Sequence, residues 1–456
     1  MKKRLPTGRV LDMTQGKPLG LILRFAVPLF IGNIFQQLYS MADTMVVGHH
    51  LGDQALAAIG ATASLFSLII NFAGGLNNGY GIVVTQRFGS HDTRQMKQAI
   101  AGMLVLNAAA ALVLTTLALI CLRPLMTFMN TPAAVFDQAY RYMVIIFAGM
   151  AATMGYNLFA AILRAFGNSR SPLYFLILSS LLNILLDVLF VMVFSMGIGG
   201  AALATVLAQT VSAVLCGGYV MKYYREYLPE PSDFRVPKRI LRNLFTMGFS
   251  MALMSSLVDL GSVFFIRANN VLGEAMITAY AAGRKLLIIM IQPQATIATA
   301  NSTFIAQNWG ARKPARIRTA LRQSLLLELG WSFFASTVIF LFGAGLIRLT
   351  TGTEDPRIIS SAVLSLRIHF AMFPVLGMLF CIRNALQAMG QKLAPVLSSG
   401  IELGMKILSA NLFIPHLGFL GTCITEPITW GLMVIFLSTV YLSRRKALFA
   451  SLSSEK

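Results

Sequence analysis

Long apolar stretches, interrupted by glycine, proline, asparagine or clusters of charge, follow one another along almost the whole chain. Each is long enough to cross the roughly 30 Å hydrocarbon core of a bilayer as an α-helix, which takes about 20 residues. The apolar positions run continuously instead of alternating over about ten residues, so transmembrane β-strands are disfavoured. The pattern predicts twelve transmembrane helices, near residues 20–47, 55–82, 98–121, 135–164, 172–195, 199–221, 243–268, 276–304, 320–346, 358–386, 394–414 and 419–442.

Composition supports this interpretation. Of the 456 residues, 56% are hydrophobic and only 12% are charged, whereas soluble domains carry about 25% charged residues. A cytosolic enzyme, a disordered chain and a collagen-like chain are therefore excluded, and we predict an all-α, polytopic membrane protein. The four cysteines lie far apart in apolar stretches without a CxxC pair, which favours core residues over metal ligands.

Basic residues outnumber acidic ones, 37 to 17, and most of them lie in the amino-terminal segment, in every second connection and in the carboxyl-terminal tail. By the positive-inside rule, both termini then face the cytoplasm, and the chain spans the inner (plasma) membrane many times. Topology and attraction to anionic lipid headgroups explain the net charge of +20, so no nucleic-acid partner is needed.

The longest polar connection, residues 222–242, divides the chain into an amino-terminal lobe, 1–221, and a carboxyl-terminal lobe, 243–456, with six spans each. At an offset of 221, Leu51-Gly52-Asp53 aligns with Leu272-Gly273-Glu274, and further matches keep the same order. Six spans are an even number, so we expect two six-helix bundles of equal orientation, related by a pseudo-two-fold axis along the membrane normal. Parallel repeats of this kind are typical of secondary transporters, which bind substrate between the repeats.

Several motifs also resemble one transporter family. They are Gln36-Gln37-Leu38-Tyr39, Asp43, Val47-Gly48, Leu51-Gly52 and Gln86 in the first two spans, Arg164-Ala165-Phe166-Gly167-Asn168 after span four, and Gln387-Ala388-Met389-Gly390 in the second half. With these motifs the whole chain resembles the MATE (multidrug and toxic compound extrusion) transporters. The resemblance implies the MATE fold and export of drug-like, often cationic molecules by alternating access, in exchange for H⁺ or Na⁺ moving inward.

A carboxylate at membrane depth is costly, so it usually faces a cavity or finds a partner. Asn183 and Asp187 lie four residues apart, which puts an amide and a carboxylate on one helical face, and Asp43 in the first span is a natural second acid. Such oxygen ligands suit a hard cation, for which Na⁺ at Asp43 and Asp187 is the candidate. A buried carboxylate beside a second acid could equally carry a proton. The MATE resemblance implies a cation-coupling site made of Asp43, Tyr142, Asn157, Asn183, Asp187 and Thr205. The alternative places Asp43 at the outer water boundary and makes Asn183 a bridge between helices.

Three further ionisable residues of the second half are secondary candidates. Asp259 lies near a position where another branch of the family uses a glutamate in coupling, and a packing hydrogen bond is an equal alternative. Glu402 and Lys406 are spaced for an i,i+4 salt bridge, which favours a structural pair over a role in the cleft.

Arg284 is the last secondary candidate. With Lys285 it interrupts span eight, where it could face the cleft or snorkel to the headgroups. We interpret Glu328 and Glu426 as structural. The glycine-rich segment 74–81 could be a hinge or a surface for close helix packing.

The chain lacks HExxH, GxSxG and P-loop signatures, so the sequence predicts a transporter and no enzyme, driven by an ion gradient without a cofactor. The first alternative is a lipid-linked oligosaccharide flippase of the same superfamily, whose anionic substrate calls for a cleft rich in arginine and lysine. Only Arg284, Lys285, Arg367 and Lys406 are embedded here, against six carboxylates, which favours drug export. We expect a monomer that exports cationic or amphipathic small molecules; the choice between Na⁺ and H⁺ and the physiological substrate stay open.

Overall fold

The computed structural model describes residues 10–453 of the chain, and of residues 42–44, 451 and 453 it describes the backbone alone. Throughout these described residues the secondary structure is helical and contains no strand. The predicted all-α fold class is confirmed. The chain forms two compact units, Met1–Asp12 with Val27–Ala252 and Met13–Ala26 with Leu253–Lys456. Two long helices pass from one unit into the other, α1 near its start and α7 at Ala252.

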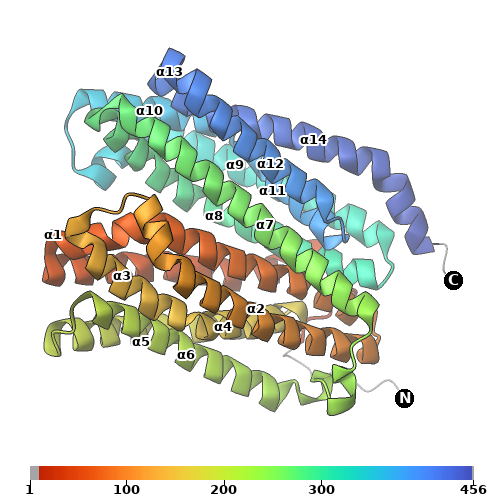
Figure 1. The fold of residues 1–456 in the computed structure, drawn as a ribbon. Helices are drawn as coiled ribbons and strands as arrows, with labels where there is room; N and C mark the ends of the chain where they lie inside the picture. Colours follow the sequence, from red (N-terminus) through yellow and green to blue (C-terminus); the bar gives the residue numbers. More distant parts are fainter. Residues whose placement is uncertain (1–9, 454–456) are drawn as a thin grey trace. The chain divides into compact units, whose positions relative to one another are not determined.

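The first unit is built on six helices and the beginning of a seventh. They are α1 (Pro18–Gly89), α2 (Thr93–Phe128), α3 (Ala133–Ala148), α4 (Met150–Ala165), α5 (Arg170–Asp187), α6 (Gly197–Tyr223) and α7 (Lys238–Asn269). Helix α6 packs along α3, α4 and α5, and α2 packs on α3 and α4 (Figure 1). The core of this unit is therefore lined by small and apolar residues of α4 and α6, such as Ala161 and Ala204. Between α6 and α7, two short 3₁₀-helices, Arg225–Tyr227 and Pro231–Phe234, form the polar connection.

The second unit contains the rest of α7 and seven further helices. They are α8 (Glu274–Gly310), α9 (Pro314–Thr351), α10 (Pro356–Ala371), α11 (Phe373–Ala388), α12 (Leu393–Leu408), α13 (Ile414–Leu417) and α14 (Phe419–Ser453). Helices α8, α9 and α11 pack against one another, and α14 packs on α10, α11 and α12 (Figure 1). Because α14 packs against several helices at once, more than half of its apolar window is buried, 56%, compared with 17–39% for the other apolar helices.

Within the described residues, nine helices are long and apolar enough to cross a membrane, or eleven if two bent helix pairs count as one span each. The remaining predicted span, 276–304, corresponds to α8. That helix has 37 residues, so it is long enough to cross the bilayer, but it carries Arg284 and Lys285 and is not among the nine. The first two predicted spans are joined in α1 across one non-helical residue, Gly52.

The duplication predicted from sequence recurs in the backbone conformation. Gly52 (φ 75°, ψ −174°) and Gly273 (φ 90°, ψ 164°) occupy matching positions, and both adopt a region of φ/ψ space that is essentially restricted to glycine. Each glycine therefore allows a sharp change of direction between two long helices. A π-helical turn follows α5 at Val188–Val193, and another follows α12 at Ser409–Phe413.

Two predicted spans, 135–164 and 358–386, are bent rather than continuous. Helices α3 and α4 meet at 44°, and α10 and α11 meet at 49°. At the first bend, a Cβ on Gly149 would lie 2.3 Å from Val206 of α6, so the backbone approaches that helix too closely for a side chain. At the second bend, Pro374 lacks the N–H that a continuous helix needs.

Candidate functional site

A cavity of about 660 Å³ opens within the first unit, between α1, α3, α4, α5 and α6. This volume lies in the range that drug-sized ligands occupy in proteins. Asn33, Gln36 and Tyr39 of α1 contribute amide and phenol groups, and Phe66 and Leu176 contribute apolar surface. The wall can therefore contact a flat apolar molecule while offering it several hydrogen-bond partners.

Three of the residues predicted for the cation site lie in the wall of this cavity. They are Tyr142 of α3, Asn157 of α4 and Thr205 of α6. The two remaining residues with described side chains, Asn183 and Asp187, are buried on α5 and do not line the cavity. Asn183 contacts Thr205, so the structure brings the acid–amide pair to the back of the cavity wall.

Asp187 is fully buried, with 0% of its surface exposed, at the last residue of α5. The hydrogen-bond pattern assigns the orientation of the Asn183 amide: its nitrogen donates to Oδ2 of Asp187 (2.8 Å), and its oxygen accepts from the backbone N–H of Thr205 (3.0 Å). The i,i+4 pairing expected from the sequence is therefore present. A π-helical turn begins directly after Asp187, a local widening that is frequent at functional sites.

Asp43, the predicted second acid, lies in α1, but its side chain is outside the described residues. Its place relative to Asp187 stays a prediction. Among the lining residues whose side chains the structure describes, Arg164 at the end of α4 carries the one formal charge. Its Nη2 donates to Oδ1 of Asn78 (3.4 Å). The described cavity surface is thus largely neutral, and Asp187 lies behind Thr205, linked to it through the Asn183 amide.

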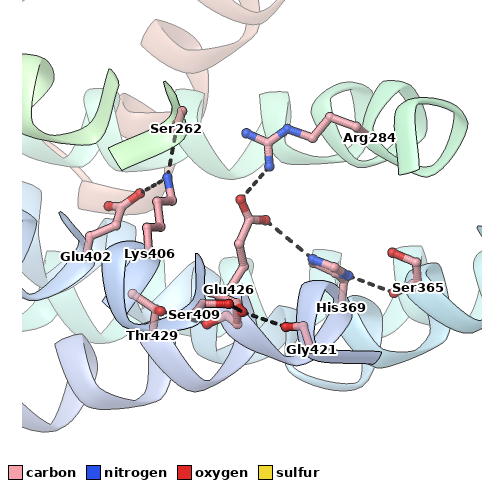
Figure 2. A network of polar contacts seen from close by, with 11 residues as sticks. Ser262, Arg284, Ser365, His369, Glu402, Lys406, Ser409, Gly421, Glu426 and Thr429 are labelled. Carbon is pink, nitrogen blue, oxygen red and sulfur yellow. Dashed lines mark hydrogen bonds and ion pairs between the residues drawn. The ribbon is translucent and has the colours of Figure 1, made fainter. Parts of the chain in front are cut away.

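The secondary candidates belong to the second unit. Lys406 is buried and its Nζ donates to Oε1 of Glu402 (2.8 Å) and to Oγ of Ser262 (3.1 Å), which confirms the predicted salt bridge (Figure 2). Asp259 is half-buried on α7. Asp259, Glu402 and Lys406 do not line the cavity of the first unit.

The sequence left open whether Arg284 faces the cleft or snorkels to the headgroups, and the structure shows an ion-pair partner for it. Its Nη1 donates to Oε1 of Glu426 (2.6 Å), and Oε2 of the same carboxylate lies 3.4 Å from Nε2 of His369 (Figure 2). The sequence alone favours a structural role for Glu426 and gives no signal for His369. The only available signal was a glutamate in the apolar stretch around Thr425-Glu426-Pro427, since its partners lie on distant helices.

Comparison with known proteins identifies the family. The family model described as MatE matches residues 28–189 and 247–411, one segment in each half of the chain. The chain belongs to the MATE family. The resemblance noted in the sequence is thereby confirmed, and family membership makes the protein a transporter rather than an enzyme.

Similar proteins match this chain over most of its length. The probable multidrug resistance protein YpnP of Bacillus subtilis is 27% identical over 84% of this chain and 85% of its own. The probable multidrug resistance protein YoeA of the same organism is 25% identical, over 91% of this chain and 92% of its own. A solved structure of an outward-facing multidrug resistance MATE family transporter superposes with a TM-score of 0.89 at 23% identity. The superposition covers 98% of this chain and 99% of the other. The protein therefore has the MATE fold and is a multi-pass membrane protein.

Proposed function

We propose that this MATE protein is a secondary active exporter of cationic or lipophilic small molecules, driven by H⁺ or Na⁺ through alternating access. The observation that carries the proposal is the buried Asp187–Asn183 pair beside a drug-sized cavity in the first unit. The names of the relatives, which are multidrug resistance proteins, support the substrate class.

The coupling site follows from the chemistry of Asp187. A carboxylate without exposed surface in a membrane helix is stabilised by binding a proton or a small cation. Asn183 holds one carboxylate oxygen through its amide nitrogen, and the hydroxyl of Thr205 lies within 3.3 Å of the same amide. We include Asp43, Tyr142 and Asn157 in this site. H⁺ and Na⁺ both suit such oxygen ligands.

Substrate binding is assigned to the 660 Å³ cavity. A cationic guest would be attracted by the carboxylate behind Thr205, and the attraction is lost when a proton or Na⁺ neutralises Asp187. Cation and drug then exclude each other, which is the requirement for exchange. Aromatic side chains such as Phe66, Tyr39 and Tyr142 provide contacts that do not depend on one substrate shape.

We further propose that the protein lies in the inner (plasma) membrane with both termini in the cytoplasm, works as a monomer and needs no cofactor. Most basic residues lie in the connections that this orientation places inside.

Uptake of ethidium into everted membrane vesicles, which corresponds to export from the cell, tests the proposal. An imposed pH gradient or Na⁺ gradient should drive uptake by the wild type, and Asp187→Asn should reduce it to the level of vesicles without the protein. Asp137→Asn, at an exposed position of α3, is the matched control and should transport like the wild type. Full gradient-driven uptake by Asp187→Asn would remove the coupling site, and failure of both gradients with every cationic dye would remove the exchange mechanism.

A further inference from the structure

His369 on α10 is a buried histidine, 3% exposed, that lies between two acceptors. Its Nδ1 is 2.7 Å from the backbone carbonyl of Ser365, and its Nε2 is 3.4 Å from Oε2 of Glu426 on α14 (Figure 2). The second carboxylate oxygen of Glu426 accepts a hydrogen bond from Arg284 on α8. Three helices of the second unit thus converge on one carboxylate.

These contacts determine where hydrogen atoms must be. A carbonyl oxygen can only accept, so Nδ1 of His369 carries hydrogen. In a neutral ring, Nε2 would then present a lone pair to the Glu426 carboxylate, which is also an acceptor. The two atoms attract each other only when a proton lies between them. Because the Arg284 guanidinium donates a hydrogen bond to the Glu426 carboxylate, a proton bound between the two atoms would sit on Nε2 and make the ring an imidazolium.

Other ionisable groups around His369 and Glu426 come from α8, α12 and α14. They are Tyr280 and Arg284 on α8, Glu402 and Lys406 on α12, and Cys423 on α14. On helix α9, Ser336 donates to the carbonyl of Phe370. The ionisable residue of α9 nearest to Ser336 is Glu328, about 12 Å away along the helix axis. On α11 the first ionisable residue is Cys381. No described carboxylate other than Glu426 contacts His369.

A cavity of about 10 Å³ adjoins the triad and is lined by Tyr280, Ser365, His369 and Glu426 among others. This volume is at the lower limit of the space that one water molecule requires. A single water at that place would have polar partners on several sides. The site is therefore closed to a drug or a hydrated ion but open to a proton carried by water.

We propose that His369, Glu426 and Arg284 form a proton-binding site of the second unit, separate from the coupling site proposed at Asp187. One proton is bound by Nε2 of His369 against Oε2 of Glu426. Its release to water leaves a neutral imidazole whose lone pair faces the carboxylate, so the contact between α10 and α14 becomes repulsive. Proton binding therefore holds these two helices together, and proton release loosens them.

Trp430 supplies a local reporter for this proton. Its ring lies 5.7 Å from the His369 ring and is 8% exposed. An imidazolium quenches indole fluorescence, and histidines ordinarily change charge between about pH 5 and 8. In the full chain with Trp309→Phe and Trp331→Phe, the fluorescence of Trp430 should change with pH as a one-proton transition, in the absence of drug or gradient.

Three variants make the test specific. His369→Gln should abolish the transition. Glu426→Gln should lower the proton affinity of the site at least about tenfold, because the carboxylate that stabilises the imidazolium is gone. His416→Gln is the matched control: His416 makes the same Nδ1 contact with the carbonyl four residues earlier (2.8 Å to Leu412), but it is exposed. The control should keep the transition.

Trp430 fluorescence that is independent of pH in the parent protein would overturn the proposal, even if His369→Gln does not fold. A transition that persists in folded His369→Gln would overturn it as well. The titration uses neither ethidium nor an ion gradient, so its result is independent of the transport experiment on Asp187.

Discussion

At the scale of single residues, buried ionisable side chains in this transporter differ in how they are accommodated. Glu426 has two partners, Arg284 and His369, and Lys406 has Glu402. Glu328 on α9 is different: it is 0% exposed, and neither carboxylate oxygen has a hydrogen-bond partner among the described residues. A partnered charge is stabilised by its partner, whereas a lone charge only costs desolvation energy.

This contrast predicts opposite results for two chemically identical substitutions. Glu328→Gln replaces a carboxyl group that lacks partners by a neutral amide of the same size, so the stability should stay within about 1 kcal/mol or increase. Glu426→Gln leaves Arg284 without its counter-charge and should cost about 3 kcal/mol, the lower end for a broken buried pair, because Arg284 is half-buried. Thermal unfolding in detergent, followed by tryptophan fluorescence, measures both. Equal losses in the two variants would show that Glu328 has a partner of comparable strength.

At the scale of helices, the glycine-rich segment 74–81 is a packing surface. A Cβ on Gly79 would lie 2.5 Å from the carbonyl oxygen of Met247, and one on Gly75 would lie 2.6 Å from Cα of Ala252. On the facing helix, a Cβ on Gly248 would lie 2.2 Å from the ring of Tyr80. Helices α1 and α7 therefore approach each other at backbone distance within the first unit. The sequence left a hinge and close packing as alternatives, and the structure shows close packing.

Gly79→Ala should therefore destabilise the transporter by about 1–3 kcal/mol, because a backbone carbonyl cannot move aside as a flexible side chain could. Gly60→Ala is the control on the same helix: it is exposed, no atom lies within 4 Å of its Cβ, and alanine favours a helix over glycine by up to about 1 kcal/mol. Denaturant unfolding in micelles compares the two. If Gly79→Ala is as stable as Gly60→Ala, α1 and α7 do not approach as described.

The same helices show what the sequence could and could not predict. The pairs Asn183–Asp187 and Glu402–Lys406 were predictable because four residues bring two side chains to one face of any α-helix. The turns at Gly52 and Gly273 lie in connections between predicted spans, and the internal repeat aligns the two glycines. The network around Glu426 was not predictable, because its arginine is 142 positions away and meets it only through tertiary packing, in which α8 and α14 share the neighbours α10 and α11. Its histidine reaches it from α10 in the same way.

At the scale of the whole molecule, the strongest sequence signal is the distribution of charge between alternate connections. The connection 222–242 is rich in lysine and arginine, whereas the connection between α9 and α10 holds Glu354 and Asp355 beside single arginines at its ends. Because basic connections are retained on the cytoplasmic side, these two segments should lie on opposite faces of the membrane. Ser232 and Glu354 are exposed, so each can report the side on which its connection lies.

We therefore expect opposite labelling of Ser232→Cys and Glu354→Cys by a membrane-impermeant thiol reagent, in a chain whose four native cysteines are replaced by alanine. Glu354→Cys should react in intact cells, where the outer face is accessible, and Ser232→Cys should react only in everted vesicles. Labelling of both residues from one side would mean that the number of spans between them is even, not three as predicted. The first span to doubt would then be α8, which is not among the nine helices that are long and apolar enough to cross a membrane. Reversed labelling would place the carboxylate of Asp187 in a transporter of inverted polarity, in which the same ion gradient would drive uptake instead of export.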